Sequence, residues 1–403
     1  MANSTVIRPF SHVFLSQFLF APDGLPFTDD EIIGYDQTLS AYEQMFLNPD
    51  IEKTLISKNE LLASFAISKA EASQITMKEA QDVYALLVEN PQYDFIGKKL
   101  REKKKLTQKD YDQLEFFNIA KTFRIFSQKI ISIEDITPSF IQEVHRQLIQ
   151  GMDIFQNHLS DFTVYKSGMW RDNDDIRVAA YIPAHFGDIP NGVNELLVYL
   201  QKNQTPIGIA VFHTGLYGLH PFNNGNKRVC RILEHMLLRS IGLNAKNLYS
   251  TSYYYHTEKP RYYKYLLFSL ERKNLNHFVS FMLESLVLSI VSVLKTSIEV
   301  KRNEFFQKQH IEGVGKSVLK PLLKRKELQF KYLAKYADGK VARQTLVTTL
   351  QNAVSQGILV RREVGKTTYY RLNLSLPEEE TLEEWLTTIH KRLSYIPDDI
   401  ALI

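Results

Sequence analysis

The spacing of apolar residues constrains the fold of this chain more than any other feature. Over most of the 403 residues, apolar side chains recur at intervals of three and four, as in residues 61–88, 117–126 and 278–294, and strict alternation is rare. This period is typical of helices that bury one face. A chain of this length is too long for one ordinary core, so we expect two or three domains. The fold class predicted is therefore mainly α.

The helical pattern changes near residue 301. Residues 301–316 are polar and contain two glycines, which favours a linker. The order then becomes helix, turn, helix and paired strands, with Gly365-Lys366 as the turn between the strands. That succession resembles a small α+β winged-helix domain, which we place at 317–374. An acidic tail is expected at 375–403.

Ahead of the linker, two further regions are predicted. Residues 1–110 read as an N-terminal helical region that ends in a basic run, and residues 111–300 read as a central helical domain. Between residues 170 and 190 the helical pattern breaks into V-A-A-Y-I-P, bracketed by Asp, Asn and Pro. This break predicts a surface β-hairpin.

Charge is distributed unevenly along the chain. The net charge is +4, but residues 314–373 hold thirteen Lys/Arg against three Asp/Glu, a balance of +10, so the remainder carries −6. A basic segment of this kind is typical of nucleic-acid binding, so residues 317–374 predict DNA as a partner. A basic winged helix also binds proteins, and that alternative stays open.

Composition excludes several classes of protein. The N-terminal residues have no basic stretch leading into an apolar one, so no export signal is predicted, and the location expected is cytoplasmic. The most apolar stretch, 278–294, is interrupted by Glu284 and four serines, so a buried helix is predicted and no membrane segment. Cys230 is the only cysteine, which rules out an internal disulfide and a cysteine-based zinc site.

The residues most suggestive of chemistry are L-H-P-F-N-N-G-N-K-R-V-C-R at 219–231, ahead of a helix with one apolar stripe. Gly225 and Asn226 permit tight turns, which bring N–H groups together at a helix N-terminus where an anion is favoured. Arg228 and Arg231 are three residues apart and can both reach a polyphosphate. His220 can accept a proton near neutral pH. The pattern predicts a phosphate site beside a base, with a structural histidine and a solvated helix face as alternatives.

This string resembles the signature of the Fic family, H-P-F-x-[D/E]-G-N-[G/K]-R-x-x-R, and matches it at every defined position except Asn224. Other segments fall where the family has similar ones: H-R-Q-L at 145–148, S-G-M-W-R at 167–171, Y-I-P at 181–183, and His213, seven residues before His220. The resemblance implies a Fic-type helical bundle with a β-hairpin flap.

The resemblance also implies a function. The chain would be a protein adenylyltransferase, a nucleotidyltransferase that moves AMP from ATP to a Ser, Thr or Tyr hydroxyl of a target protein (AMPylation), with Mg²⁺ neutralising charge. His220 would be the general base and Phe222 would anchor the loop. The nucleotide would be bound by residues of the motif: Gly225, Asn226, Lys227, Arg228 and Arg231. The flap at Tyr181, Ile182 and Pro183 would align the target's backbone.

A further segment is similar to the family's inhibitory helix. It reads I-S-K-A-E-A-S-Q-I-T at 67–76, and it implies that Glu71 reaches the phosphate loop, pairs with Arg231 and excludes the γ-phosphate. The enzyme would then be autoinhibited. Residues 253–263, rich in tyrosine, lie where the family lines the pocket for the base.

Three points leave alternatives open. Asn224 stands where the family has the Asp or Glu that binds magnesium, and an amide oxygen coordinates the metal without adding charge. The chain could thus be a catalytically weak or inactive Fic-core regulator that binds DNA. Lys227 also occurs in Doc-like toxins, which phosphorylate their targets, so a protein phosphotransferase is the third reading. The sequence does not decide between a monomer and a homodimer.

Overall fold

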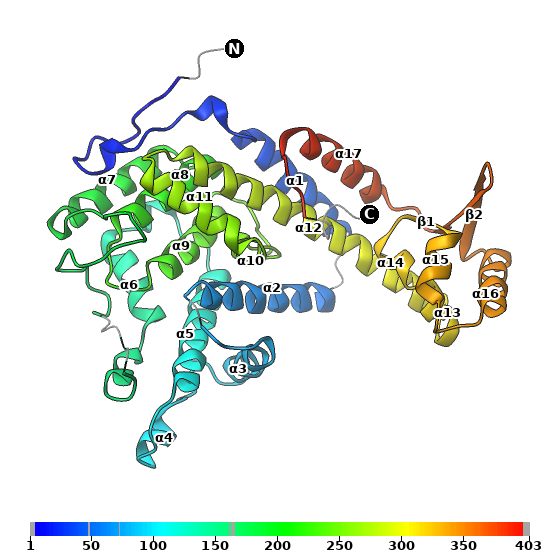
Figure 1. Cartoon of the computed structure of the whole chain (residues 1–403), viewed down its shortest axis with the longest axis horizontal. Helices are drawn as coiled ribbons and strands as arrows, with labels where there is room; N and C mark the ends of the chain where they lie inside the picture. Colours follow the sequence, from blue (N-terminus) through cyan, green and yellow to red (C-terminus); the bar gives the residue numbers. More distant parts are fainter. Residues whose placement is uncertain (1–4, 47–48, 72, 161, 163–165, 398–403) are drawn as a thin grey trace. The chain divides into compact units, whose positions relative to one another are not determined.

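The structure is a computed structural model that describes residues 5–46, 49–71, 73–160, 162 and 166–397 (Figure 1). It is mainly helical and divides into two compact units, Met1–Ser289 and Ile290–Ile403, whose boundary falls within one helix. The α-helices of the first unit are α1 (Asp29–Phe46), α2 (Pro49–Lys69), α3 (Met77–Glu89), α4 (Gly97–Arg101), α5 (Gln108–Gln128), α6 (Pro138–Leu148), α7 (Ile189–Lys202), α8 (Pro206–Leu219), α9 (Asn226–Ser240), α10 (Thr251–Thr257), α11 (Lys259–Glu271) and the start of α12 (Asn276–Lys308). Short 3-10 helices connect them: η1 (Leu15–Gln17), η2 (Pro22–Gly24), η3 (Ile133–Asp135), η4 (Met152–Asn157) and η5 (Phe186–Asp188).

Helix α8 forms the centre of the first unit. Its sequence is apolar all round, and every residue from Gly208 to Leu219 is buried. Glycines let α7 approach it closely, since a Cβ at Gly215 would lie 2.6 Å from Leu196 Cδ2 and one at Gly192 would lie 2.7 Å from Leu219 Cδ2. A larger residue at either glycine would force the facing leucine side chain to shift.

Helices α8 and α9 pack against each other and are joined by the loop predicted to carry the chemistry. Helix α9 also contacts α5 and α6, and α2 packs on α5, α9 and α10 (Figure 1). The apolar stripe predicted after residue 228 is buried, including Val229, Leu233 and Leu237. Because α2 packs on these later helices, residues 1–110 do not form a separate domain.

The second unit contains the end of α12 and a small mixed domain. Its elements are α13 (Gly313–Leu319), α14 (Pro321–Lys324), β1 (Glu327–Gln329), α15 (Phe330–Ala337), α16 (Arg343–Ser355), β2 (Leu359–Val364), β3 (Thr367–Leu372) and α17 (Pro377–Arg392). The three strands are antiparallel in the order β1-β3-β2. Val364 pairs with Thr367, so Gly365-Lys366 forms the turn as predicted, with Gly365 at φ 60°. One apolar core joins the elements from α13 to β3, with Leu319, Leu333, Leu346 and Tyr370 among its members.

Two predictions for this part of the chain were wrong. Residues 301–308 of the expected linker continue α12, because Ile298, Arg302 and Phe306 keep a buried face at four-residue spacing. The expected acidic tail forms α17, in which Glu378 and Glu379 are buried. Glu378 pairs with Lys301, and Glu379 Oε1 accepts from Arg302 Nη2 at 2.8 Å. Both segments contain charged residues and so look solvent-exposed in sequence. These charges are nevertheless buried, because they neutralise each other in ion pairs.

Among the described residues, only α12 is long and apolar enough to cross a bilayer. Its apolar window is 78% buried in the structure, which agrees with the predicted core helix. Cys230, in α9, is also buried.

Candidate active site

The loop between α8 and α9 turns sharply at both ends. His220 ends α8 in the left-handed region, at φ 52°, and Gly225 precedes α9 at φ 79°. The left-handed conformation costs a residue other than glycine about 1–3 kcal/mol, and such strain is concentrated at functional sites. Arg171 holds the strained turn in place, since its Nε donates to the His220 carbonyl at 2.8 Å and its backbone N–H donates to the Pro221 carbonyl at 2.8 Å.

The side chain of Asn226 closes the loop. Its Oδ1 accepts from the Phe222 N–H at 3.0 Å and its Nδ2 donates to the Phe222 carbonyl at 2.8 Å. Phe222 is fully buried and stacks on the ring of His145, with centroids 3.8 Å apart. Phe222 thus anchors the loop in the core as predicted, and the carboxamide of Asn226 is occupied in shaping the loop.

His145, on α6, connects the loop to the segment that precedes the flap. Its Nδ1 accepts from the Gly168 N–H at 3.0 Å, so the neutral ring carries its proton on Nε2, which donates to the Asn224 carbonyl at 3.1 Å. Burial, aided by the charge of Arg228, lowers the pKa of His145 to about 3 and keeps the ring neutral. Sequence reasoning noted the surrounding motif but gave this histidine no role.

Arg228 connects the loop to α5. The residue is fully buried, its Nη1 donates to Glu115 Oε1 at 2.9 Å, and its Nη2 reaches Asn224 Oδ1 at 3.4 Å. Burial raises the pKa of the Glu115 carboxyl to about 7, although Arg228 acts in the opposite direction. Glu115 was not predicted as part of the site. A carboxylate on the same face of α5 as Ile119 and Thr122 was the available signal.

Arg231 is the most unusual cation in the site. It is 2% exposed, its Nη1 donates to the Ala66 carbonyl at 3.2 Å, and its guanidinium lies 4.3 Å from the ring centroid of Tyr262 and 5.2 Å from that of Tyr255. Within the described part of the chain it forms no ion pair. Burying a charge without an opposite charge is unfavourable, so this position favours an anionic ligand. Tyr255 and Tyr262, which belong to the segment expected to line the pocket for the base, instead contact Arg231.

The predicted inhibitory residue lies at the loop, but not against the arginine that was expected. Glu71 follows the end of α2, with Oε1 3.9 Å from Arg228 Nε and Oε2 3.9 Å from Lys227 Nζ. The predicted pair between Glu71 and Arg231 is therefore wrong, because Arg231 lies against the tyrosine rings. Of the same segment, Thr76 caps α3, and residue 72 lies outside the described residues.

His220 is 9% exposed, and its Nδ1 is buried with no hydrogen-bond partner in the described structure. Burial lowers its pKa to about 4, so the imidazole is neutral at pH 7. Its ring contacts Tyr217 edge-on, at a centroid distance of 5.2 Å. His213, seven residues earlier, does not reach the loop: its Nδ1 lies 2.5 Å from Glu234 Oε2, and both side chains are buried.

The flap is held by side chains more than by strand pairing. The predicted hairpin is reduced to one antiparallel bridge, between Val178 and Tyr181. The Tyr181 hydroxyl donates to the Gly218 carbonyl at 2.9 Å, Pro183 is buried, and Ile182 is 60% exposed. Of the three predicted flap residues, only Ile182 presents its side chain to solvent.

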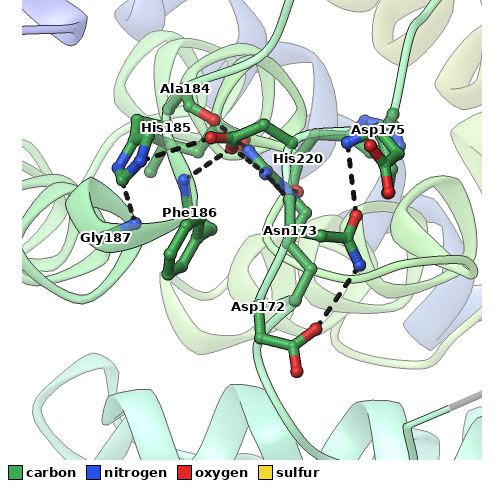
Figure 2. A network of polar contacts seen from close by, with 12 residues as sticks. Asp172, Asn173, Asp175, Ala184, His185, Phe186, Gly187 and His220 are labelled. Atoms are coloured by element: carbon green, nitrogen blue, oxygen red, sulfur yellow. Dashed lines mark hydrogen bonds and ion pairs between the residues drawn. The ribbon is translucent and has the colours of Figure 1, made fainter.

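Arg171 joins the flap to the loop, because it donates to carbonyls of both. Figure 2 shows the polar network here, with Ala184, His185 and His220 labelled. Besides the His220 carbonyl, Arg171 contacts the Ala184 carbonyl, and its Nη1 donates to Asp174 Oδ1 at 2.9 Å. Asp174 in turn accepts from the Phe186 N–H at 2.9 Å and lies 3.3 Å from His185 Nε2. A cavity of about 190 Å³ adjoins this network. It is lined by Arg171, Asp174, Ile176, Arg177, Ile182, Pro183, Ala184 and His185. Sequence reasoning noted Arg171 as the end of S-G-M-W-R but gave it no role, because nothing nearby in the sequence identifies its partners.

The residues at Asn224 do not form a magnesium site by themselves. The Asn224 side-chain oxygen already accepts from the Gly225 N–H at 2.7 Å and from Arg228. No cluster of three or more His, Cys, Asp or Glu suited to a metal occurs among the residues that the structure describes. The oxygen that would bind the metal is used to shape the loop.

The fold and the loop together give a helical domain in which a helix N-terminus, where an anion is favoured, follows a loop that begins with a neutral histidine. Residues 135–238, which run from before α6 through most of α9, match the model of the Fic/DOC family. Residues 135–238 are therefore a Fic/DOC family domain, and this domain includes the whole loop. No curated protein matches the chain significantly.

Similar solved structures include three proteins described as Fic proteins. A Fic family protein from Desulfovibrio desulfuricans is 17% identical, with a TM-score of 0.46, and the match covers 86% of this chain and 98% of that one. A Fic domain containing signaling protein from Bacteroides thetaiotaomicron has the same identity, 17%, and the same TM-score, 0.46, with coverage of 65% and 96%. Fic-1 from C. elegans is 16% identical, with a TM-score of 0.46 and coverage of 65% and 70%. The family assignment rests on residues 135–238.

Proposed function

We propose that the protein transfers AMP from ATP to a Ser, Thr or Tyr hydroxyl of a target protein. Proteins with this domain generally transfer a nucleoside monophosphate to proteins. The observation that carries the proposal is Arg231, a buried guanidinium beside the N-terminus of α9 that forms no ion pair within the described structure. A triphosphate would supply the missing negative charge.

The loop provides the remaining parts of the reaction. The first-turn N–H groups of α9 have no intrahelical acceptors, and Gly225, at the cap position, has no side chain to occupy them. They would bind the phosphates together with Lys227. The target hydroxyl would attack the α-phosphorus, its proton would pass to the His220 imidazole, and the bond to the bridging oxygen would break to release pyrophosphate. Mg²⁺ would neutralise charge on the phosphates.

The electrostatics of His220 fit this role only with the nucleotide present. A pKa of about 4 makes the imidazole a weak base in the free protein. A nearby triphosphate would favour the imidazolium and raise the pKa towards neutrality. The acceptor of the proton would thus become effective when the substrate is bound.

We also propose that Glu71 restrains the enzyme, through Lys227 and Arg228. Its carboxylate lies 3.9 Å from both side chains and would repel a phosphate at the start of α9. Two bonds from α11 hold this end of α2 over the loop: the Tyr263 hydroxyl donates to the Ala70 carbonyl at 2.7 Å, and Lys259 Nζ donates to the Lys69 carbonyl at 3.1 Å. Admission of ATP would require this end to move.

Labelled ATP tests the proposal directly. With α-labelled ATP, the Glu71→Gly variant should label itself or an added target, whereas wild type and Glu71→Gly/His220→Ala should label weakly or not at all. Glu102→Gly, which removes an exposed carboxylate that pairs with Lys104, is the matched control and should behave as wild type. Circular dichroism would verify that each variant is folded.

The same experiment separates the competing functions. Label delivered only from γ-labelled ATP would show a Doc-like phosphotransferase and contradict AMP transfer. Absence of label from every folded variant, with either nucleotide, would contradict both reactions and leave a Fic core that binds without catalysis.

A further inference from the structure

We propose that the second unit binds duplex DNA and that the exposed face of α16 reads base edges in the major groove. The proposal is independent of AMP transfer, because every residue that it uses lies in unit 2. It rests on three features of that unit: the side chains on α16, the cations beside the helix, and the way the helix is fixed in the domain.

The solvent-facing side of α16 carries an unusual set of side chains. Leu346, Leu350 and Ala353 are buried in the core of the unit. The opposite face, which is exposed, consists of amides and hydroxyls: Gln344, Thr345, Thr348, Gln351, Asn352 and Ser355. The helix contains no Asp or Glu, and its one charged residue is Arg343.

An ordinary solvated helix face has a different composition. It usually carries Glu and Lys, which are good helix formers and stabilise each other at four-residue spacing. Thr, Asn and Ser are poorer helix formers, so these residues cost helix stability without adding packing. They do offer hydrogen-bond donors and acceptors on one face. Gln and Asn pair with the N6 and N7 edge of adenine, and the methyl group of Thr contacts that of thymine.

Exposed cations lie on the elements that pack beside α16. Arg361, Arg362, Lys366 and Arg371 are exposed on the β2–β3 hairpin, and Lys331 and Lys335 are exposed on α15. Arg361 pairs with Glu363, and Arg362 Nε lies 3.1 Å from Glu327 Oε1. Exposed pairs of this kind contribute little to stability, so phosphates can replace the carboxylates. The segment's balance of +10 would favour that exchange.

The domain also fixes the helix that would enter the groove. A turn containing Gly339, at φ 71°, joins α15 to α16, and Leu333 and Ala337 of α15 share one core with Leu346 of α16. An α-helix is about 10–12 Å across and the major groove of B-form DNA is about 12 Å wide, so α16 fits. The groove of A-form RNA is too narrow for it. The exposed face of α16 carries no large apolar side chain, which disfavours a protein partner.

The test uses the full chain and a library of labelled duplexes with a random 20-base-pair core. Selection should enrich a sequence, and the selected duplex should bind at least about tenfold more tightly than the random pool. Affinity should fall by about 100-fold between 50 and 200 mM salt if about four phosphates are contacted.

Two pairs of substitutions distinguish readout from charge. Gln344→Ala/Gln351→Ala should remove the preference for the selected duplex and keep the salt dependence. Arg361→Ala/Lys366→Ala should weaken binding to all duplexes and reduce the slope of log affinity against log salt by about two. His220→Ala should change neither, so failure of the AMP-transfer proposal would not affect this result.

Several outcomes would overturn the proposal. The folded chain would show no duplex binding at 50 mM salt, or selection would enrich no sequence. Equal or tighter binding of duplex RNA would identify a different partner. Retention of sequence preference by the Gln344→Ala/Gln351→Ala variant would show that α16 does not read the bases.

Discussion

Asn224 uses its side-chain oxygen within the loop, where it accepts from Gly225 and Arg228. An aspartate of similar shape would keep both bonds and add a negative charge next to the phosphates. We expect Asn224→Asp, in the Glu71→Gly background, to lower the Mg²⁺ concentration needed for half-maximal labelling by about tenfold or more. The measurement is the rate of transfer from α-labelled ATP against Mg²⁺. Asn224→Ala, which removes the acceptor, should slow transfer at every Mg²⁺ concentration, and an unchanged Mg²⁺ dependence in Asn224→Asp would contradict the argument.

At this scale the sequence predicted what is local and missed what is distant. His220, Gly225, Arg228 and Arg231 fall within twelve residues, so spacing alone indicated an anion site. Glu115 lies 113 residues from its partner Arg228, and no sequence pattern predicts that contact. The pair expected between Glu71 and Arg231 was wrong for the same reason, since the position of a guanidinium depends on rings that belong to other helices.

The segment from Arg171 to His185 contains no helix, and its only β-pairing in the described structure is the bridge between Val178 and Tyr181. Arg171 holds it through backbone carbonyls, so a change at this residue should alter both the flap and the turn at His220. We expect Arg171→Lys to lower kcat by about 10- to 100-fold with a smaller effect on KM for ATP, and to lower the free energy of unfolding by about 1–3 kcal/mol, because carbonyls lose their donors. Arg177→Lys, an exposed arginine in the same segment, is the control and should leave both quantities nearly unchanged. Equal effects of the two substitutions would show that Arg171 does not position the base.

Helices could be predicted where the three- and four-residue spacing of apolar residues continues over many residues. Helices α9 and α12 follow directly from apolar spacing, as does the β2–β3 hairpin from its Gly-Lys turn. The flap was not predictable as observed, because the six residues V-A-A-Y-I-P do not reveal that a buried arginine holds the segment in place of strand pairing. Helix α17 was missed because buried ion pairs look like a solvated tail in sequence.

The stability of the whole molecule should depend on pH through its buried histidines. Burial lowers the pKa of His235, which stacks on Phe123 at 4.3 Å, to about 3. A histidine whose pKa is lowered by folding binds fewer protons when folded. Its contribution is therefore complete above pH 6.5 and is lost as the pH falls towards 3. Glu115, whose pKa is raised to about 7, acts in the opposite direction, so the wild-type slope alone is ambiguous.

A comparison with His235→Gln isolates the contribution of His235 to the pH dependence of the unfolding free energy. We expect the difference in unfolding free energy between wild type and His235→Gln to shrink by about 1.4 kcal/mol for each pH unit below 6.5. Urea unfolding at pH 7, 6 and 5 measures it. A difference that stays constant over this range would show that His235 titrates normally in the folded chain.

The position of the boundary between the two units could not be predicted from composition. A change of pattern near residue 301 was visible in sequence, but the division falls at residue 289, within a helix whose buried period runs through both sides. Composition indicated that the basic segment differs from the rest, and the structure adds that Arg302 and Phe306 of α12 contribute to the second unit.

The single cysteine provides a built-in chemical reporter. Cys230 is 2% exposed, and burial raises the pKa of its thiol, so iodoacetamide should react with it very slowly in the closed protein. It directly precedes Arg231, and movement of the end of α2 that admits ATP should also expose the thiol. Glu71→Gly should then be alkylated at least about tenfold faster than wild type, and ATP should protect it. Mass spectrometry would follow the modification without any added label, and equal rates in the two proteins would mean that this carboxylate does not keep the site shut.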